Sequence, residues 1–171
     1  MNLNDLLQRY AGLTAADLRG TALAGSVPLT NAAIDALIAR RLGSVHLPVT
    51  SVKIDARQGD TFVAEVVARA PFVPPIRVQI AIERQPVFPA DPVLHLRWSL
   101  AGMGALSSFA GPLLAMFKTP PIGVAVTGDR VSVNLPEFLR GRGLGDVAAA
   151  LRELEVRTQP GITVVRFSAG L

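Results

Sequence analysis

Apolar and polar residues alternate with a period of two along much of the chain after residue 50. In each such run the apolar residues share one side and charged or polar residues share the other. This pattern is typical of antiparallel strands with one buried and one wet face. The runs lie at 52–57, 62–69, 76–83 and 94–100. We therefore expect a four-stranded antiparallel meander, with a turn at Gln58-Gly59-Asp60.

Two further segments have the pattern of hairpins. One covers 123–135 and turns at Gly128-Asp129; the other covers 154–170 and turns at Pro160-Gly161. Both turns place glycine where the chain must reverse. The predicted sheet therefore combines a meander with two hairpins.

Helical spacing marks a smaller part of the chain. Segment 29–43 has apolar residues three and four apart, Thr30 as a helix cap and Gly43 as its end. Short helical turns are expected at 3–11 and 14–19, and 136–154 reads as a helical turn, a glycine loop and a helix at 146–154. Segment 21–29 reads as irregular or extended. The fold class is α+β, with an N-terminal helical or extended segment at 1–27 and one domain at 28–171.

The stretch Trp98–Phe117 contains no charged residue. Its length is close to that of a membrane-spanning helix, but glycines, serines and Pro112 dilute it, and its first residues belong to the strand at 94–100. The remainder, 104–117, reads as an apolar helix kinked at Pro112. An ordinary core helix and a helix facing an apolar ligand remain as alternatives.

Composition favours a binding role over a catalytic one. Half of the 171 residues are hydrophobic, yet only nine are aromatic, so the inner face consists mostly of small and branched aliphatic side chains. Such side chains fill a wide interior poorly, and a dry apolar void accepts an apolar guest. No cysteine and two histidines argue against thiolate chemistry and a histidine metal site. No nucleophile has an adjacent base, so neither an enzyme nor a cofactor is expected.

The order of elements resembles that of the bacterial tubular lipid-binding (TULIP-like) superfamily, in its phospholipid-binding lipoprotein-like group. The resemblance covers about residues 28–168: the capped helix LTNAAIDALIARRL, the meander, an apolar helix, the hairpin PPIGVAVTGDRVSVNL and the closing RGLGD…LEVRT segment. It implies a highly curved antiparallel sheet wrapped around one or two apolar helices, enclosing a lipid groove.

The candidate ligand-binding residues lie on the apolar faces of these predicted elements. They are Ile34, Leu37, Ile38, Ile80, Ile82, Leu96, Trp98, Leu106, Phe109, Leu113, Leu114 and Phe117. The net charge of +4 favours anionic partners. Arg40, Arg41, Arg140 and Arg142, at predicted helix ends, are candidates for contact with a lipid head group or an anionic membrane. Dispersed arginines and few aromatics argue against nucleic acid.

The sequence therefore favours non-catalytic binding, and with it transport, of a lipid or another apolar molecule. The alternative is a structural or interaction protein that buries its apolar surface in a homodimer or against another chain, through a strand edge or helix 104–117. The N-terminus lacks the features of a secretory signal. This indicates a cytoplasmic protein, peripheral to the membrane if it docks there, or a periplasmic one if a leader had been removed.

Overall fold

The structure is a computed structural model. It describes residues 20, 22–43, 49–69, 74–100 and 120–170. These residues form nine strands and three short helices. The strands are β1 (Ala22–Thr30), β2 (Val49–Arg57), β3 (Thr61–Ala68), β4 (Ile76–Arg84), β5 (Val93–Leu100), β6 (Val124–Thr127), β7 (Arg130–Asn134), β8 (Leu151–Gln159) and β9 (Ile162–Gly170). The helices are α2 (Asn31–Gly43), α4 (Leu135–Arg140) and α5 (Gly145–Ala150).

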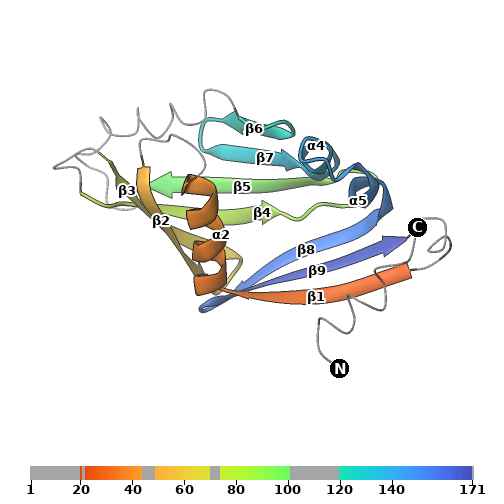
Figure 1. Cartoon of the computed structure of the whole chain (residues 1–171), viewed down its shortest axis with the longest axis horizontal. Coiled ribbons are helices and arrows are strands. Elements are labelled where there is room, and N and C mark those ends of the chain that lie inside the picture. Colours follow the sequence, from red (N-terminus) through yellow and green to blue (C-terminus); the bar gives the residue numbers. More distant parts are fainter. Residues whose placement is uncertain (1–19, 21, 44–48, 70–73, 101–119, 171) are drawn as a thin grey trace.

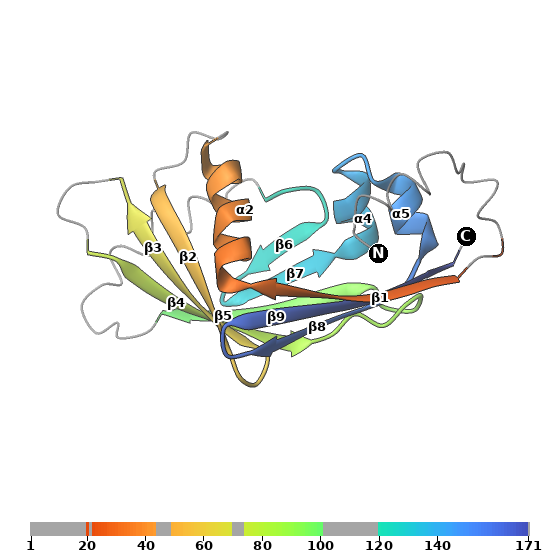
Figure 2. The same ribbon diagram turned by 60° about the horizontal axis from the view of Figure 1, so that its bottom comes forward.

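The strands form two antiparallel sheets. The larger has six strands in the order β2-β3-β4-β5-β7-β6, and the smaller has three in the order β1-β9-β8. In Figure 1, β2 and β3 are steeply inclined to β5 and β7, so the larger sheet is strongly twisted. Figure 2 shows the smaller sheet running from the β2–β3 end of the larger one toward α5. Both sheets are open. The predicted α+β class with antiparallel strands is confirmed.

The period-two segments form the strands that they predicted. The four-stranded meander becomes β2 to β5, and the first hairpin becomes β6 and β7 with Gly128 at a φ of 60°. The second hairpin becomes β8 and β9 with Gly161 at a φ of 78°. The expected helix at 29–43 becomes α2, and the Thr30 hydroxyl accepts a hydrogen bond from the Ala33 N–H at 3.2 Å, as a helix cap does.

One segment is more regular than expected, and a second differs from expectation. Segment 21–29, read as irregular or extended, supplies β1, which runs through the expected boundary at residues 27 and 28 and pairs along its whole length with β9. The expected helix at 146–154 ends early: α5 stops at Ala150, and Leu151 begins β8. Pairing with β9 overrides the helical propensity of residues 151–154, with a register irregularity between Leu151 and Glu153.

Thr158 joins the two sheets at one corner, where the β2–β3 and β8–β9 turns meet. Its hydroxyl donates to the Arg57 carbonyl at 2.5 Å and accepts from the Thr61 N–H at 2.9 Å. Its own N–H donates to the Asp60 carboxylate at 3.1 Å. The Thr158 side chain is buried, so these bonds replace water that cannot reach the groups.

An ion pair lies on the outer side of the same corner. The Arg157 guanidinium donates to Asp60 at 2.6 Å and to Glu155 at 2.8 Å. Hydrogen bonding to Asp60 and then to Glu155 raises the pKa of Arg157 above its ordinary value. Arg157 is solvent-exposed, so these ion pairs contribute little to the free energy of unfolding.

Side chains cover one outer edge of each sheet. At the edge of β2, the Ala56 N–H donates to the Asn31 amide oxygen at 3.0 Å, and the Ile54 N–H donates to the Asp35 carboxylate at 2.7 Å. Both acceptors lie on α2, one turn apart. At the edge of β8, the Gln85 amide bonds both the N–H of Val156 at 3.0 Å and its carbonyl at 2.6 Å. These bonds occupy strand edges that would otherwise be free to pair with another strand.

The buried core over the described residues is small. No large side chain is fully buried there, and the buried apolar residues lie in two places. They are Val49, Ala56, Ala64, Val66 and Ile76 in the larger sheet, and Ala148, Ala150 and Leu151 where α5 meets β8. Most large aliphatic side chains are therefore only half-buried.

Candidate functional site

One face of the six-stranded sheet is continuously apolar. The strand register brings apolar residues side by side in successive rows, and the charged residues of these strands lie on the opposite face, together with a few small or branched aliphatic ones. One row is Ala56, Phe62, Ile80 and Trp98; a second is Ile54, Ala64, Val78 and Leu100; a third is Ile82, Leu96, Val131 and Val126. The apolar face therefore extends across all six strands.

Four of the predicted ligand-binding residues lie together on this face. Ile80 pairs with Trp98 and Ile82 pairs with Leu96 across β4 and β5. All four side chains are half-buried. The indole N–H of Trp98 is buried and has no hydrogen-bond partner among the described residues. These four side chains are therefore only partly covered, whereas the indole N–H beside them is buried and unpaired among the described residues.

The three candidates on α2 are placed less favourably. Ile34 and Ile38 are half-buried, but Leu37 is 56% exposed. The helix runs beside β2, the strand to which Asn31 and Asp35 bind. Figure 1 shows α2 as a short helix close to the β2 end of the sheet. It covers one margin of the apolar face.

The remaining apolar candidates, Leu106, Phe109, Leu113, Leu114 and Phe117, lie outside the described residues. The same holds for the expected helix at 104–117 and for the helical turns at 3–11 and 14–19. Their roles stay predictions from the sequence.

The candidate arginines lie on α2, at the end of α4 and in the turn that follows α4. Arg40 is exposed on α2, and the Arg41 side chain is outside the described part. Arg140 is exposed in the last turn of α4, and the Arg142 guanidinium lies 5.0 Å from the centre of the Phe138 ring in a cation–π contact. Figures 1 and 2 both show α2 and α4 apart, so Arg40 does not form one patch with Arg140 and Arg142.

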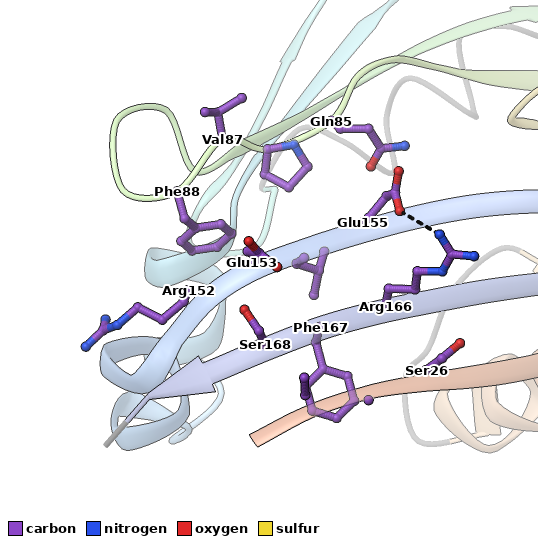
Figure 3. Close-up of a pocket in the computed structure, with 14 residues that line it drawn as sticks. Ser26, Gln85, Val87, Phe88, Arg152, Glu153, Glu155, Arg166, Phe167 and Ser168 are labelled. Atoms are coloured by element: carbon purple, nitrogen blue, oxygen red, sulfur yellow. Dashed lines mark hydrogen bonds and ion pairs between the residues drawn. The ribbon is translucent and has the colours of Figure 1, made fainter. Parts of the chain in front are cut away.

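A separate groove of about 610 Å³ lies on the smaller sheet. Its walls are the segment that follows β4 and the polar face of β1, β9 and β8 (Figure 3). The lining residues are Ala24, Gly25, Ser26, Gln85, Pro86, Val87, Phe88, Arg152, Glu153, Leu154, Glu155, Arg166, Phe167 and Ser168. In Figure 3 the Phe88 ring lies over β8 near Glu153. The groove therefore combines apolar surface with charges of both signs.

Two of the four charged residues that line the groove, Glu155 and Arg166, pair with each other. Glu155 accepts from Arg166 at 3.5 Å, shown in Figure 3, and also pairs with Arg157. The hydroxyls of Ser26 and Ser168 have no histidine beside them in the groove lining. The groove therefore has the character of a binding surface and lacks an activated nucleophile.

Sequence reasoning missed the groove and the edge-covering side chains. A signal was present for β1, because Leu23, Val27 and Leu29 alternate with small or polar residues, but the segment was read only as irregular or extended. No local signal marks Gln85, since its partner Val156 lies 71 residues away.

Several ion pairs lie on the polar face of the larger sheet. Glu65 pairs with Arg77 at 3.3 Å, and Glu83 pairs with Arg97 at 3.0 Å and with Arg130 at 3.4 Å. All these pairs are exposed, where ion pairs contribute little to stability. They agree with a solvated outer face.

The described residues include no group of three or more His, Cys, Asp or Glu that could hold a metal ion. Within the same ranges, none of the helices combines the length and the apolar composition needed to span a bilayer.

Comparison with known proteins gives no relative. No family model, no curated protein and no solved structure matches this chain. The function must therefore be argued from the surfaces described above.

Proposed function

We propose that this protein binds, and thereby can transport, a lipid or another elongated apolar molecule against the apolar face of the six-stranded sheet, without making or breaking a bond. The observation that carries the proposal is the continuity of that face across six strands, together with the half-burial of its large side chains. Apolar surface left in water costs about 25 cal/mol per Å². A ligand covering Ile80, Ile82, Leu96 and Trp98 removes that cost.

Trp98 gives the face a polar anchor. An indole N–H is a donor only, and this one is buried without a partner among the described residues. Leaving such a donor unpaired costs about 1–3 kcal/mol. An ester or carboxyl oxygen of a lipid is a suitable acceptor, so an amphiphile fits the site better than a pure hydrocarbon.

The proposal includes the curved arrangement implied by the resemblance to the tubular lipid-binding superfamily. In it, the sheet bends around the apolar helix predicted at 104–117, and the ligand lies between them. The twist of the larger sheet and the position of α2 at its margin support this arrangement. Arg40 and Arg140, on separate helices, would contact anionic head groups as two independent sites.

The single tryptophan provides a direct test. Because Trp98 lies on the proposed binding face, a fatty acid or phospholipid with bromine on its acyl chain should quench its fluorescence in a saturable manner. Native mass spectrometry of protein purified from bacteria should show co-purified lipid. Absence of quenching up to the solubility limit, together with bare protein in the mass spectrum, would contradict the proposal.

A matched pair of variants assigns the effect to the face. Ile80→Ser should weaken binding by at least tenfold, because it places a hydroxyl beside Trp98. Gln79→Ser, at the neighbouring position on the exposed opposite face, should leave binding unchanged. Circular dichroism checks that both variants fold. Equal binding by both variants would place the ligand elsewhere.

A further inference from the structure

The open edge of β1 differs from the other long edges of the two sheets. Asn31 and Asp35 cover the edge of β2, and Gln85 and Asp60 cover that of β8. The edge of β6 has only four residues. No hydrogen bond from a described residue reaches the outer edge of β1, which is nine residues long.

Two observations show which backbone groups of β1 point outward. The Asn31 N–H bonds the Gly161 carbonyl at 3.1 Å, so odd-numbered residues of this strand face β9. Pro28 has no N–H and pairs with Val164, which suits a position whose nitrogen points away from β9. The N–H and carbonyl groups of Ala24 and Ser26 therefore point to the open edge.

The strand is neutral and apolar as well as open. Ala22–Thr30 contains no charged residue, although the chain carries a net charge of +4. Edge strands that avoid pairing usually carry lysine or another charge. Leu23 is 63% exposed and Val27 is 44% exposed, both on the same face of the strand.

We propose that β1 pairs antiparallel with β1 of a second copy of this chain, about a two-fold axis at Gly25. In this register Ala24 and Ser26 of one copy exchange backbone hydrogen bonds with Ser26 and Ala24 of the other. Leu23 of each copy lies opposite Val27 of its partner, so the two exposed side chains cover each other. Pro28 lies at the end of the paired segment, so its missing N–H removes only a terminal hydrogen bond.

A second copy is favoured as the occupant because the strand is complementary to itself in this register. A contact between two copies of a chain with a net charge of +4 tends to bring charges of the same sign close together, and like charges opposed across strands are destabilising. A segment without charge avoids that repulsion. The result is a six-stranded sheet in which the two three-stranded sheets continue each other. The inference does not depend on lipid binding.

Self-association is measured first on the full chain. Sedimentation or light scattering from about 1 to 100 μM should show a monomer–dimer equilibrium. The N–H of Ser26 points away from β9, as the nitrogen of Pro28 does, so Ser26→Pro should be tolerated within one copy. Because it removes an N–H that would bond the second copy, it should weaken association by at least tenfold. Val27→Lys should do the same without any change in backbone. Thr127→Lys, on the short β6 edge, should leave association unchanged.

The register is tested by cysteines in this cysteine-free chain. Leu23→Cys combined with Val27→Cys should give a dimer linked by disulfides, because opposed residues in a non-hydrogen-bonded pair lie about 4.5 Å apart at Cα. Within one chain the two positions are roughly 13 Å apart, too far for a bridge. Each single cysteine variant should crosslink poorly, because residue 23 does not face residue 23.

Three results would overturn the proposal. They are a monomer over the whole concentration range, a dimer that both Ser26→Pro and Val27→Lys leave intact, and efficient crosslinking by the single variants. Hydrogen exchange at the Ala24 and Ser26 amides tests whether something else covers the edge of β1. Slow exchange in a monomer would show that another part of the same chain covers it, which would also overturn the proposal.

Discussion

Thr158 and Thr163 face each other across β8 and β9, and both side chains are buried, yet only one hydroxyl is used. Thr158 bonds Arg57 and Thr61, whereas the Thr163 hydroxyl has no hydrogen-bond partner among the described residues. The pair therefore offers a direct comparison of a satisfied and an unsatisfied buried hydroxyl.

Thr158→Val should lower the free energy of unfolding by about 2–4 kcal/mol, because it leaves the Arg57 carbonyl and the Thr61 N–H buried without a hydrogen-bond partner. Thr163→Val should be neutral or stabilising, because it removes a polar atom that is buried without a partner. Urea unfolding monitored by Trp98 fluorescence measures both. Equal losses in the two variants would show that the corner bonds do not stabilise the fold.

Gly123 and Gly128 both have positive φ, but their surroundings differ. A Cβ on Gly123 would lie 2.9 Å from the Asn134 carbonyl oxygen and closer still to the Phe138 nitrogen, whereas a Cβ on Gly128 meets nothing within 4 Å. Gly128→Ala should cost about 1–2 kcal/mol through backbone strain alone. Gly123→Ala should cost at least about 3 kcal/mol, because overlap with backbone adds to the strain. Thermal unfolding should rank them in that order, and a reversed order would contradict the packing of α4 against Gly123.

Asn31→Ala should destabilise the protein by about 1–3 kcal/mol and increase aggregation, because it frees the Ala56 N–H, which belongs to a fully buried residue at the β2 edge. Ala32→Gln, at an exposed position on the same helix, is the control and should change little. Urea unfolding and light scattering on heating measure the two effects. An Asn31→Ala variant as stable and soluble as the control would show that the edge is protected by other means.

Gln85→Glu gives a prediction that depends on pH. The introduced carboxylate would replace the amide donor and face the Val156 carbonyl, which favours the protonated form. The pKa of that carboxyl is therefore raised on folding. A group of this kind contributes stability that is present below its unfolded pKa, about 4.3, and is lost as the pH rises through the higher folded pKa.

The loss in stability of Gln85→Glu relative to the natural protein should thus be largest near pH 7 and should shrink below about pH 4. Gln85→Ala removes both bonds at every pH and serves as the control, with a difference from the natural protein that stays constant. Urea unfolding at matched pH values measures both. A pH-independent loss for Gln85→Glu would mean that its side chain turns away from β8.

The strands of the larger sheet were predictable because alternation directly reports which side chains share a face. The sequence placed Ile80, Ile82, Leu96 and Trp98 on one side of their strands, and the register puts them in adjacent rows. What the alternation could not give is how much of that face other elements cover, since that depends on the path of segments between the strands.

The missed features depend on partners distant in the chain. No local signal shows that the Phe167 ring lies across Gly25, where a Cβ would come within 2.9 Å of that ring. The ring covers the bare backbone, so glycine is tolerated inside β1. Leu151 had a good helical pattern, but Ala169 pairs with it in the strand that follows.

The pairing of β1 with β9 joins Ala22 to Gly170, nearly the full length of the chain. On the ribosome, β1 is made before β9, its neighbour in the sheet, and β2 to β8 are made between them. The loop that this pairing closes is among the longest available to a chain of this size, so the smaller sheet is expected to assemble after the larger one. Until then the uncharged first strand has both of its edges bare. The interval between synthesis of the first and last strands is therefore when the protein is most exposed to misassembly.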